Sequence, residues 1–144
     1  MNILQVAIIV FCFLEGLNIL VLYTKPMMKK GNGIGVFKVL SEVDEKGQTF
    51  ALIKYLTNWV ANVKVIFIAL AITIVILGSE TTQFYAVIAL ILSILLFYAT
   101  LFPILKKLDD ANMLTPKGYS KTLAYTISSF LLMFIVAIIV FMVI

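Results

Sequence analysis

Four stretches of this chain are too long and too apolar for the interior of a small soluble domain. They cover residues of about 3–23, 51–77, 83–105 and 119–143, and each supplies the roughly 20 apolar residues with which a helix crosses a bilayer. Hydrophobic residues make up 63% of the 144 positions and charged residues only 12%, which excludes an ordinary soluble domain. The sequence predicts one all-α domain over 1–144, an integral membrane protein with four transmembrane helices in an antiparallel bundle.

Lysines are distributed unevenly between the three connecting loops. The first loop holds Lys25, Lys29, Lys30, Lys38 and Lys46, the third holds Lys106, Lys107 and Lys117, and the second has none. Because cytoplasmic loops carry the excess of basic residues, we expect the first and third loops inside and both termini outside, in the cell (inner) membrane of a prokaryote. This orientation explains the net charge of +4. The chain has no arginine and no interleaved basic and aromatic surface, so no nucleic-acid partner is expected.

The first loop, 24–50, carries the periodicity of a short amphipathic helix. Apolar residues recur at i, i+3, i+4 and i+7, namely Val36, Val39, Leu40 and Val43. This pattern predicts a helix from about 35 to 45 on the cytoplasmic membrane surface. The glycines of 31–35 precede it without a strand and with the wrong spacing for a phosphate-binding loop, so they predict a flexible hinge.

Glu15 and Asn18 interrupt the first apolar stretch. Glu15 precedes Tyr23 by eight residues, which places it roughly 12 Å below the predicted cytoplasmic edge. A carboxylate at such a depth costs about 2.5–3.5 kcal/mol, and it is tolerated when it faces a partner, a cavity or a ligand. Lys64 is the nearest candidate partner, but we favour the interpretation that its long stem returns the ammonium to the interface near Trp59. An ion pair with Glu15 and contact with a ligand are the alternatives.

Polar residues of all four stretches fall in the predicted cytoplasmic half. Asn58 and Asn62 share one face of the second helix and are expected to meet Glu15, because Lys64 lies about 160° around that helix from Asn62. Pro103 is expected to kink or end the third helix. These placements predict a polar pocket open to the cytoplasm, although such residues also join helices through hydrogen bonds alone. The candidate ligand-binding residues are Glu15, Asn18, Asn58, Asn62, Lys64, Tyr98, Tyr125 and Ser129.

The residues that carry most enzyme chemistry are scarce. The sequence has no histidine, one cysteine (Cys12) and no nucleophile motif or cluster with metal-ligand spacing. Asp109 and Asp110 are interpreted as part of a solvated loop, and Thr115 and Pro116 as the start of the last helix. No catalytic residue, metal or cofactor is predicted.

In one feature the chain resembles the small multidrug-resistance transporters, namely a membrane-embedded glutamate, Glu15, in the first of four helices. It differs from them in its longer first loop, its lack of glycine-rich packing stripes and the position of Trp59 at the start of a helix. No family is assigned on this basis.

The function expected from the sequence is binding of a small amphipathic or cationic ligand, or of a lipid headgroup, in the pocket around Glu15. A proton-coupled transporter that works as an oligomer and a membrane enzyme with a lipid-like substrate are the alternatives. The expected partners are the lipid bilayer, the ligand and either a second copy of the chain or another membrane subunit.

Overall fold

The computed structural model describes residues 1–29 and 33–143 and is all-helical there. Its long helices are α1 (Ile3–Thr24), α2 (Gln48–Leu77), α3 (Glu80–Asp110) and α4 (Tyr119–Val143). All four are long and apolar enough to cross a membrane. The prediction of an all-α chain with four helices that could span a membrane is confirmed, and these helices suggest a multi-pass membrane protein.

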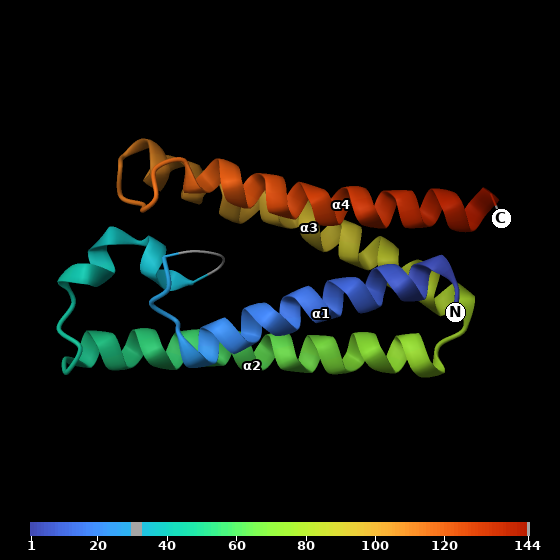
Figure 1. Cartoon of the computed structure of the whole chain (residues 1–144), viewed down its shortest axis with the longest axis horizontal. Coiled ribbons are helices and arrows are strands. Elements are labelled where there is room, and N and C mark those ends of the chain that lie inside the picture. The colour runs from blue at the N-terminus through green and yellow to red at the C-terminus, as the bar shows by residue number, and fades with distance from the viewer. Residues whose placement is uncertain (30–32, 144) are drawn as a thin grey trace.

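The two ends of the molecule are built differently (Figure 1). One end holds both chain termini and the short connection between α2 and α3, and we call it the terminal end. The other end holds segments 25–29, 33–47 and 111–118, and we call it the loop end. Helix α1 is the most enclosed, with 28% of its apolar window buried against 11–17% in the other helices, so it forms the centre of the packing.

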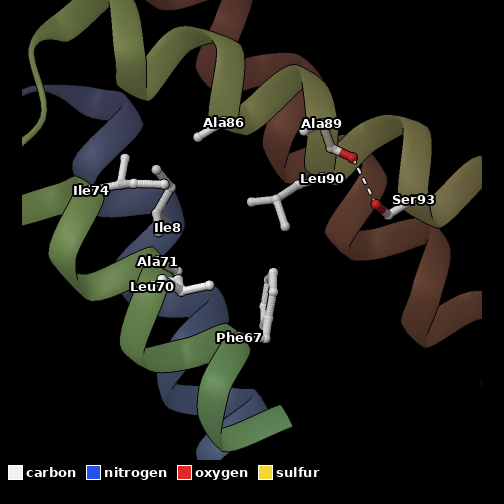
Figure 2. A pocket seen from close by; sticks show the side chains of 9 residues that line it. All are labelled: Ile8, Phe67, Leu70, Ala71, Ile74, Ala86, Ala89, Leu90 and Ser93. Carbon is white, nitrogen blue, oxygen red and sulfur yellow. Dashed lines mark hydrogen bonds between the residues drawn. The ribbon is translucent and has the colours of Figure 1, made fainter. Parts of the chain in front are cut away.

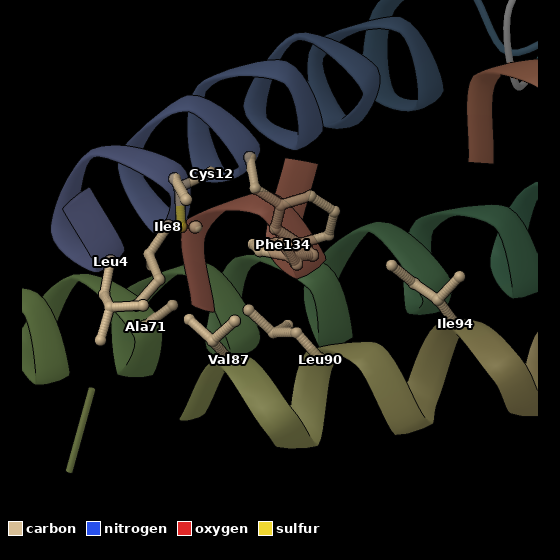
Figure 3. Close-up of a cluster of buried hydrophobic side chains, with 11 residues drawn as sticks. Leu4, Ile8, Cys12, Ala71, Val87, Leu90, Ile94 and Phe134 are labelled. Carbon is tan, nitrogen blue, oxygen red and sulfur yellow. The ribbon is translucent and has the colours of Figure 1, made fainter. Parts of the chain in front are cut away.

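An apolar cluster occupies the terminal end and draws on every long helix (Figure 3). On α1, buried positions recur at the spacing of one helical face. The ring of Phe11 packs edge-on against Phe130 and Phe134 of α4, with centroids 5.2 and 5.3 Å away. The buried members of this cluster are Leu4, Ala7, Ile8, Phe11, Cys12, Ala71, Val87, Leu90, Ile94, Phe134 and Ala137.

Amide side chains close the terminal end. Asn2 and Gln5 form a capping box at the start of α1. Gln83 of α3 is only 2% exposed; it accepts a hydrogen bond from Asn2 (2.8 Å) and donates one to the carbonyl of Gly78 (3.0 Å). These contacts fix the start of α1 to the connection between α2 and α3.

At the loop end, α3 is longer than predicted, and a buried carboxylate explains how it joins α4. Helix α3 continues through Pro103 to Asp110 instead of ending near 105. Asp109 accepts hydrogen bonds from the backbone N–H of Gly118 (3.0 Å) and of Ser120 (2.9 Å), and from the Ser120 hydroxyl (2.6 Å). The interpretation of Asp109 as solvated was therefore wrong, because it satisfies N–H groups at the start of α4.

The start of α4 also differs from the expectation for Thr115 and Pro116, because the helix begins only at Tyr119. Thr115 instead donates its backbone N–H to the carbonyl of Val36, at 2.8 Å. The residues before α4 thus pair with the first loop instead of starting the helix.

The predicted surface helix over 35–45 is not formed as one element. Two 3₁₀ helices, η1 (Ile34–Val36) and η2 (Lys38–Glu42), take its place and are separated at Phe37. Phe37 forms a β-bridge with Leu114, and this pairing takes backbone groups away from a continuous helix. Accordingly Val36 is 1% exposed whereas Val39 is 63% exposed, so the apolar residues do not share one face.

The glycines of 31–35 are partly described. Gly31 and Asn32 of the predicted hinge lie outside the described residues. A Cβ at Gly35 would overlap the backbone carbonyl of Met27, and one at Gly33 would overlap that of Met28. These two glycines permit a close approach of two backbone segments, which is a different role from that of a hinge.

Candidate functional site

Glu15 forms an ion pair inside the helical bundle. The Lys64 ammonium lies 2.6 Å from Oε2 of Glu15 and donates a second hydrogen bond, of 2.8 Å, to the side-chain oxygen of Asn18. The side chains of Lys64 and Glu15 are 29% and 13% exposed. The favoured interpretation of Lys64 as a snorkelling residue was wrong, and its alternative, the ion pair, is what the structure shows.

Lys64 reaches Glu15 because it lies on the face of α2 that packs against α1. That face follows the spacing i, i+4, i+7, i+11 and i+14, with Thr57, Ala61, Lys64, Ile68 and Ala71. Asn58 and Asn62 each lie one residue further along, about 100° around the helix. Asn62 accepts a hydrogen bond from the Tyr23 hydroxyl at the edge of the interface. The expected contact of Glu15 with Asn58 and Asn62 is therefore replaced by contact with Lys64.

The remaining predicted site residues are dispersed. The Tyr98 hydroxyl of α3 lies 2.8 Å from the Ala124 carbonyl and 2.7 Å from the Ser128 hydroxyl of α4, so it joins these two helices. Tyr125 is 76% exposed on the outer surface of α4. Asn58 is half-buried, and no hydrogen bond of its side chain is found in the described part of the chain. The structure does not gather all eight candidates into one pocket.

Three of the candidates do share a groove between α1 and α4. It has a volume of about 430 Å³ and contains Glu15 and Asn18 on one side and Ser129 on the other. Thr122 and Thr126 continue the polar strip on α4 at the spacing i, i+4, i+7 with Ser129. Tyr119 also lines the groove. Its apolar walls are formed by Leu14, Leu17, Val21, Met28, Leu123 and Phe130.

Sequence reasoning missed Thr126 and Met28. On the last helix, Thr122 and Ser129 form a regular stripe with either Tyr125 or Thr126 between them, and the candidates predicted from the sequence include Tyr125 and not Thr126. Met28 lies in the first loop, where no periodicity marks a side chain that folds back toward α1 and α4. Only the register of α4 against α1 decides between the stripes.

At Glu15, Thr126 and Ser129 the polar groups of the groove are left to accept hydrogen bonds, whereas Asn18, whose side-chain oxygen accepts from Lys64, keeps its amide N–H groups as donors. The hydroxyl of Thr126 donates to the carbonyl of Thr122 and that of Ser129 donates to the carbonyl of Thr126, so their oxygen lone pairs are left to accept. Oε2 of Glu15 accepts from Lys64, and no hydrogen bond to Oε1 is found among the described residues. A ligand that donates hydrogen bonds and carries positive charge complements this strip.

An apolar cleft between α2 and α3 offers no comparable chemistry (Figure 2). It has a volume of about 240 Å³, and its lining is apolar apart from Ser93. The Ser93 hydroxyl donates to the Ala89 carbonyl of its own helix at 2.8 Å. This cleft can accept hydrocarbon but has few means of orienting a polar ligand.

Over residues 1–29 and 33–143, no group of three or more Cys, Asp or Glu side chains is arranged to hold a metal ion. Comparison of the chain with protein-family models, with curated proteins and with solved structures finds no match. The functional argument therefore depends on the geometry of the groove.

Proposed function

We propose that the chain is a multi-pass protein of a prokaryotic cell membrane that binds a small amphipathic cation in the groove between α1 and α4. In this proposal the helices form an antiparallel bundle, the loop end is cytoplasmic and both termini are outside. The observation that carries the proposal is that Glu15, a carboxylate within an apolar helix, lines a groove in which the hydroxyl oxygens of Thr126 and Ser129 can also accept hydrogen bonds.

The shape and chemistry of the groove favour an amine over the phosphate of a lipid headgroup. A phosphate would bring a second negative charge next to Glu15, and like charges in a medium of low dielectric repel strongly. An ammonium would instead pair with Oε1 of Glu15 and donate to the hydroxyls of Thr126 and Ser129. The side chains of Leu17, Val21 and their apolar neighbours would enclose the hydrocarbon part of the ligand.

Lys64 prepares Glu15 for this role. It approaches the carboxylate from α2, whereas the groove opens on the side of α4. When no ligand is bound, the Lys64 ammonium offsets part of the cost of holding the Glu15 carboxylate within an apolar helix. A bound cation then adds to the pair or displaces Lys64, whose long stem allows the ammonium to move toward the interface.

The proposal is tested by titrating dansylcadaverine, a fluorescent amphipathic primary amine, into the protein in lipid nanodiscs. Glu15→Gln should weaken binding about tenfold or more, because one hydrogen bond to a charged group contributes about 1.5–3 kcal/mol. Glu80→Gln, which removes an exposed carboxylate at the terminal end, is the matched control and should bind as the unmodified protein does. Equal affinity of Glu15→Gln and the control would refute the proposal.

A proton-coupled transporter is the second candidate, because the Glu15–Lys64 pair is a titratable pair within the bilayer that borders a ligand groove. Proteoliposomes with an imposed pH gradient distinguish the two functions. Uptake of dansylcadaverine that requires both the gradient and Glu15 would establish transport, and binding without uptake would establish a binding protein.

A further inference from the structure

A second polar cavity lies at the loop end, between the last turns of α3 and the start of α4. Its volume is about 570 Å³. Three exposed lysines surround it, Lys106 from α3, Lys117 from the connecting segment and Lys121 from α4. The other lining residues are Phe102, Asp109, Asp110, Gly118 and Ser120.

The charges around this cavity are unbalanced in favour of the cations. The Asp109 carboxylate is engaged by the N–H groups of Gly118 and Ser120 and by the Ser120 hydroxyl. Asp110 is exposed to solvent. In the part of the chain that the structure describes, the only ion pair within 4.0 Å joins Lys64 and Glu15, so the three cavity lysines have no carboxylate at that distance. Lys117 is still near enough to act on the Asp109 carboxylate electrostatically, so the three lysines and two carboxylates of the lining leave an excess of one positive charge.

The cavity is also amphipathic along the helix axis. Phe102 precedes Lys106 by four residues, which places its ring about 6 Å deeper along α3, toward the apolar part of the helix. The ring packs edge-on against Tyr98, with centroids 5.6 Å apart, and Tyr98 is itself joined to Ser128 of α4 by a hydrogen bond. The cations thus lie on the aqueous side and a fixed aromatic ring on the hydrocarbon side.

We propose that this cavity binds the phosphate group of an anionic phospholipid. The lining carries an excess of one positive charge, which matches the single negative charge of a phospholipid phosphodiester, and basic pockets between helices at the cytoplasmic surface are suited to anionic headgroups. Inorganic phosphate shares the headgroup chemistry but has no part that would use Phe102, so the lipid is the ligand that satisfies both sides of the cavity. The site is separate from the α1–α4 groove, and its occupancy does not depend on Glu15.

The test uses the full chain in a neutral detergent and three probes: short-chain phosphatidylglycerol, short-chain phosphatidylcholine and inorganic phosphate. The site variant is Lys106→Gln, Lys117→Gln and Lys121→Gln combined. The matched control is Lys25→Gln, Lys29→Gln and Lys46→Gln, which removes the same charge from exposed lysines of the first loop. Affinities are measured by calorimetric titration.

We expect the unmodified protein to bind phosphatidylglycerol more tightly than either other probe. The site variant should lose about a hundredfold in this affinity, because each basic residue near an anionic surface contributes roughly fivefold, and the control should lose less than about threefold. Equal losses in the two variants, or no preference for phosphatidylglycerol over phosphatidylcholine, would overturn the proposal.

Phe102→Ser separates the lipid from a free anion. It should weaken phosphatidylglycerol binding several-fold and leave the weak binding of inorganic phosphate unchanged. Binding of inorganic phosphate as tight as that of the lipid would overturn the assignment to a lipid.

Discussion

The terminal end and the loop end solve the problem of helix association in different ways. At the terminal end, apolar side chains of all four helices meet in one cluster, in which Leu4 and Phe134 are fully buried. Nearer the loop end, the helices are joined in pairs. Helix α1 meets α2 through the Glu15–Lys64 pair and a small cluster of Ile19, Leu22 and Ala61, and α3 meets α4 through Tyr98 and Ser128. Lipid is as apolar as leucine, so apolar packing specifies partners only weakly, whereas a polar pair specifies one partner.

This difference bears on function because the two polar cavities lie toward the loop end. The α1–α4 groove contains Glu15 and Asn18, and the lysine cavity contains Lys106, Lys117 and Lys121. The α2–α3 cleft beside the terminal cluster is apolar. Small separations of the helices at the loop end would widen the polar cavities while the terminal cluster keeps the bundle assembled.

The largest expected effect comes from breaking the ion pair on one side only. Lys64→Met leaves the Glu15 carboxylate within the bundle without its cation, and removal of one partner of a buried pair costs about 3–5 kcal/mol. Because Glu15 and Lys64 are partly exposed, we expect about 3 kcal/mol. The free energy of unfolding is measured by titration of the folded protein from mild detergent into sodium dodecyl sulfate.

Two further variants show whether the cost arises from the unpaired charge. Glu15→Gln with Lys64→Met should recover most of the stability, because no charge remains unpaired. Lys54→Met, which removes an exposed lysine from the same helix, should change it by less than about 0.5 kcal/mol. A double variant as unstable as Lys64→Met alone would mean that the pair does not determine how α1 meets α2.

The second expected effect measures the terminal cluster. Phe134→Ala opens a cavity at a fully buried position; such changes cost about 3–5 kcal/mol in soluble cores. We expect about 2 kcal/mol here. In a lipid environment the Phe134 ring is surrounded by hydrocarbon even when it is not packed against other helices, so its burial gains little free energy from transfer out of water. Phe13→Ala, at a position that is 65% exposed, is the control in the same unfolding assay and should be nearly neutral. Equal losses at both positions would show that the cluster gives no special stability to the terminal end.

The fold class was predictable because length and hydropathy alone define a membrane helix. The inner end of α3 was not, since this helix continues to Asp110 through charged residues. Helix α4 starts at Tyr119, as the predicted stretch 119–143 does, but Thr115 and Pro116 do not belong to it. These ends are set by contacts between distant segments, such as Asp109 with Ser120 and Phe37 with Leu114. A periodic pattern describes one helix at a time and carries no information on such pairings.

The candidate site was predictable only as far as the depth of its residues. The positions of Glu15 and Asn18 along α1 already indicated a polar region at the loop end. Asn58 and Asn62 were predicted wrongly as the partners of Glu15. They flank the face of α2 that packs against α1, and small residues such as Ala61 mark that face. In a membrane helix, small residues mark the interface better than polar ones do, and they assign Lys64 to it correctly.

The smallest expected effect concerns Asp109, at the end of the molecule opposite the terminal cluster. Helix α3 has 31 residues and is about 46 Å long, so its last turn, with Lys106, Lys107 and Asp109, extends beyond the roughly 30 Å of hydrocarbon. There the hydroxyl of Ser120, assisted by backbone N–H groups and by Lys117, holds the pKa of Asp109 below its usual range. Asp109→Asn should cost about 1–2 kcal/mol near pH 7, the usual contribution of a charged helix cap.

This contribution should depend on pH with a definite sign. A carboxyl group with a lowered pKa in the folded state stabilises the fold fully above its unfolded pKa, near 3.9, and loses this effect as the pH falls through the folded value. Thermal unfolding of the protein and of Asp109→Asn in detergent should therefore differ at pH 7 and pH 5 and converge well below pH 4. Asp110→Asn, at the exposed neighbour, should show no such difference. A gap between the unmodified protein and Asp109→Asn that stays constant down to the lowest pH at which the fold survives would mean that neutral hydrogen bonds, and not the charge of Asp109, join α3 to α4 at the loop end.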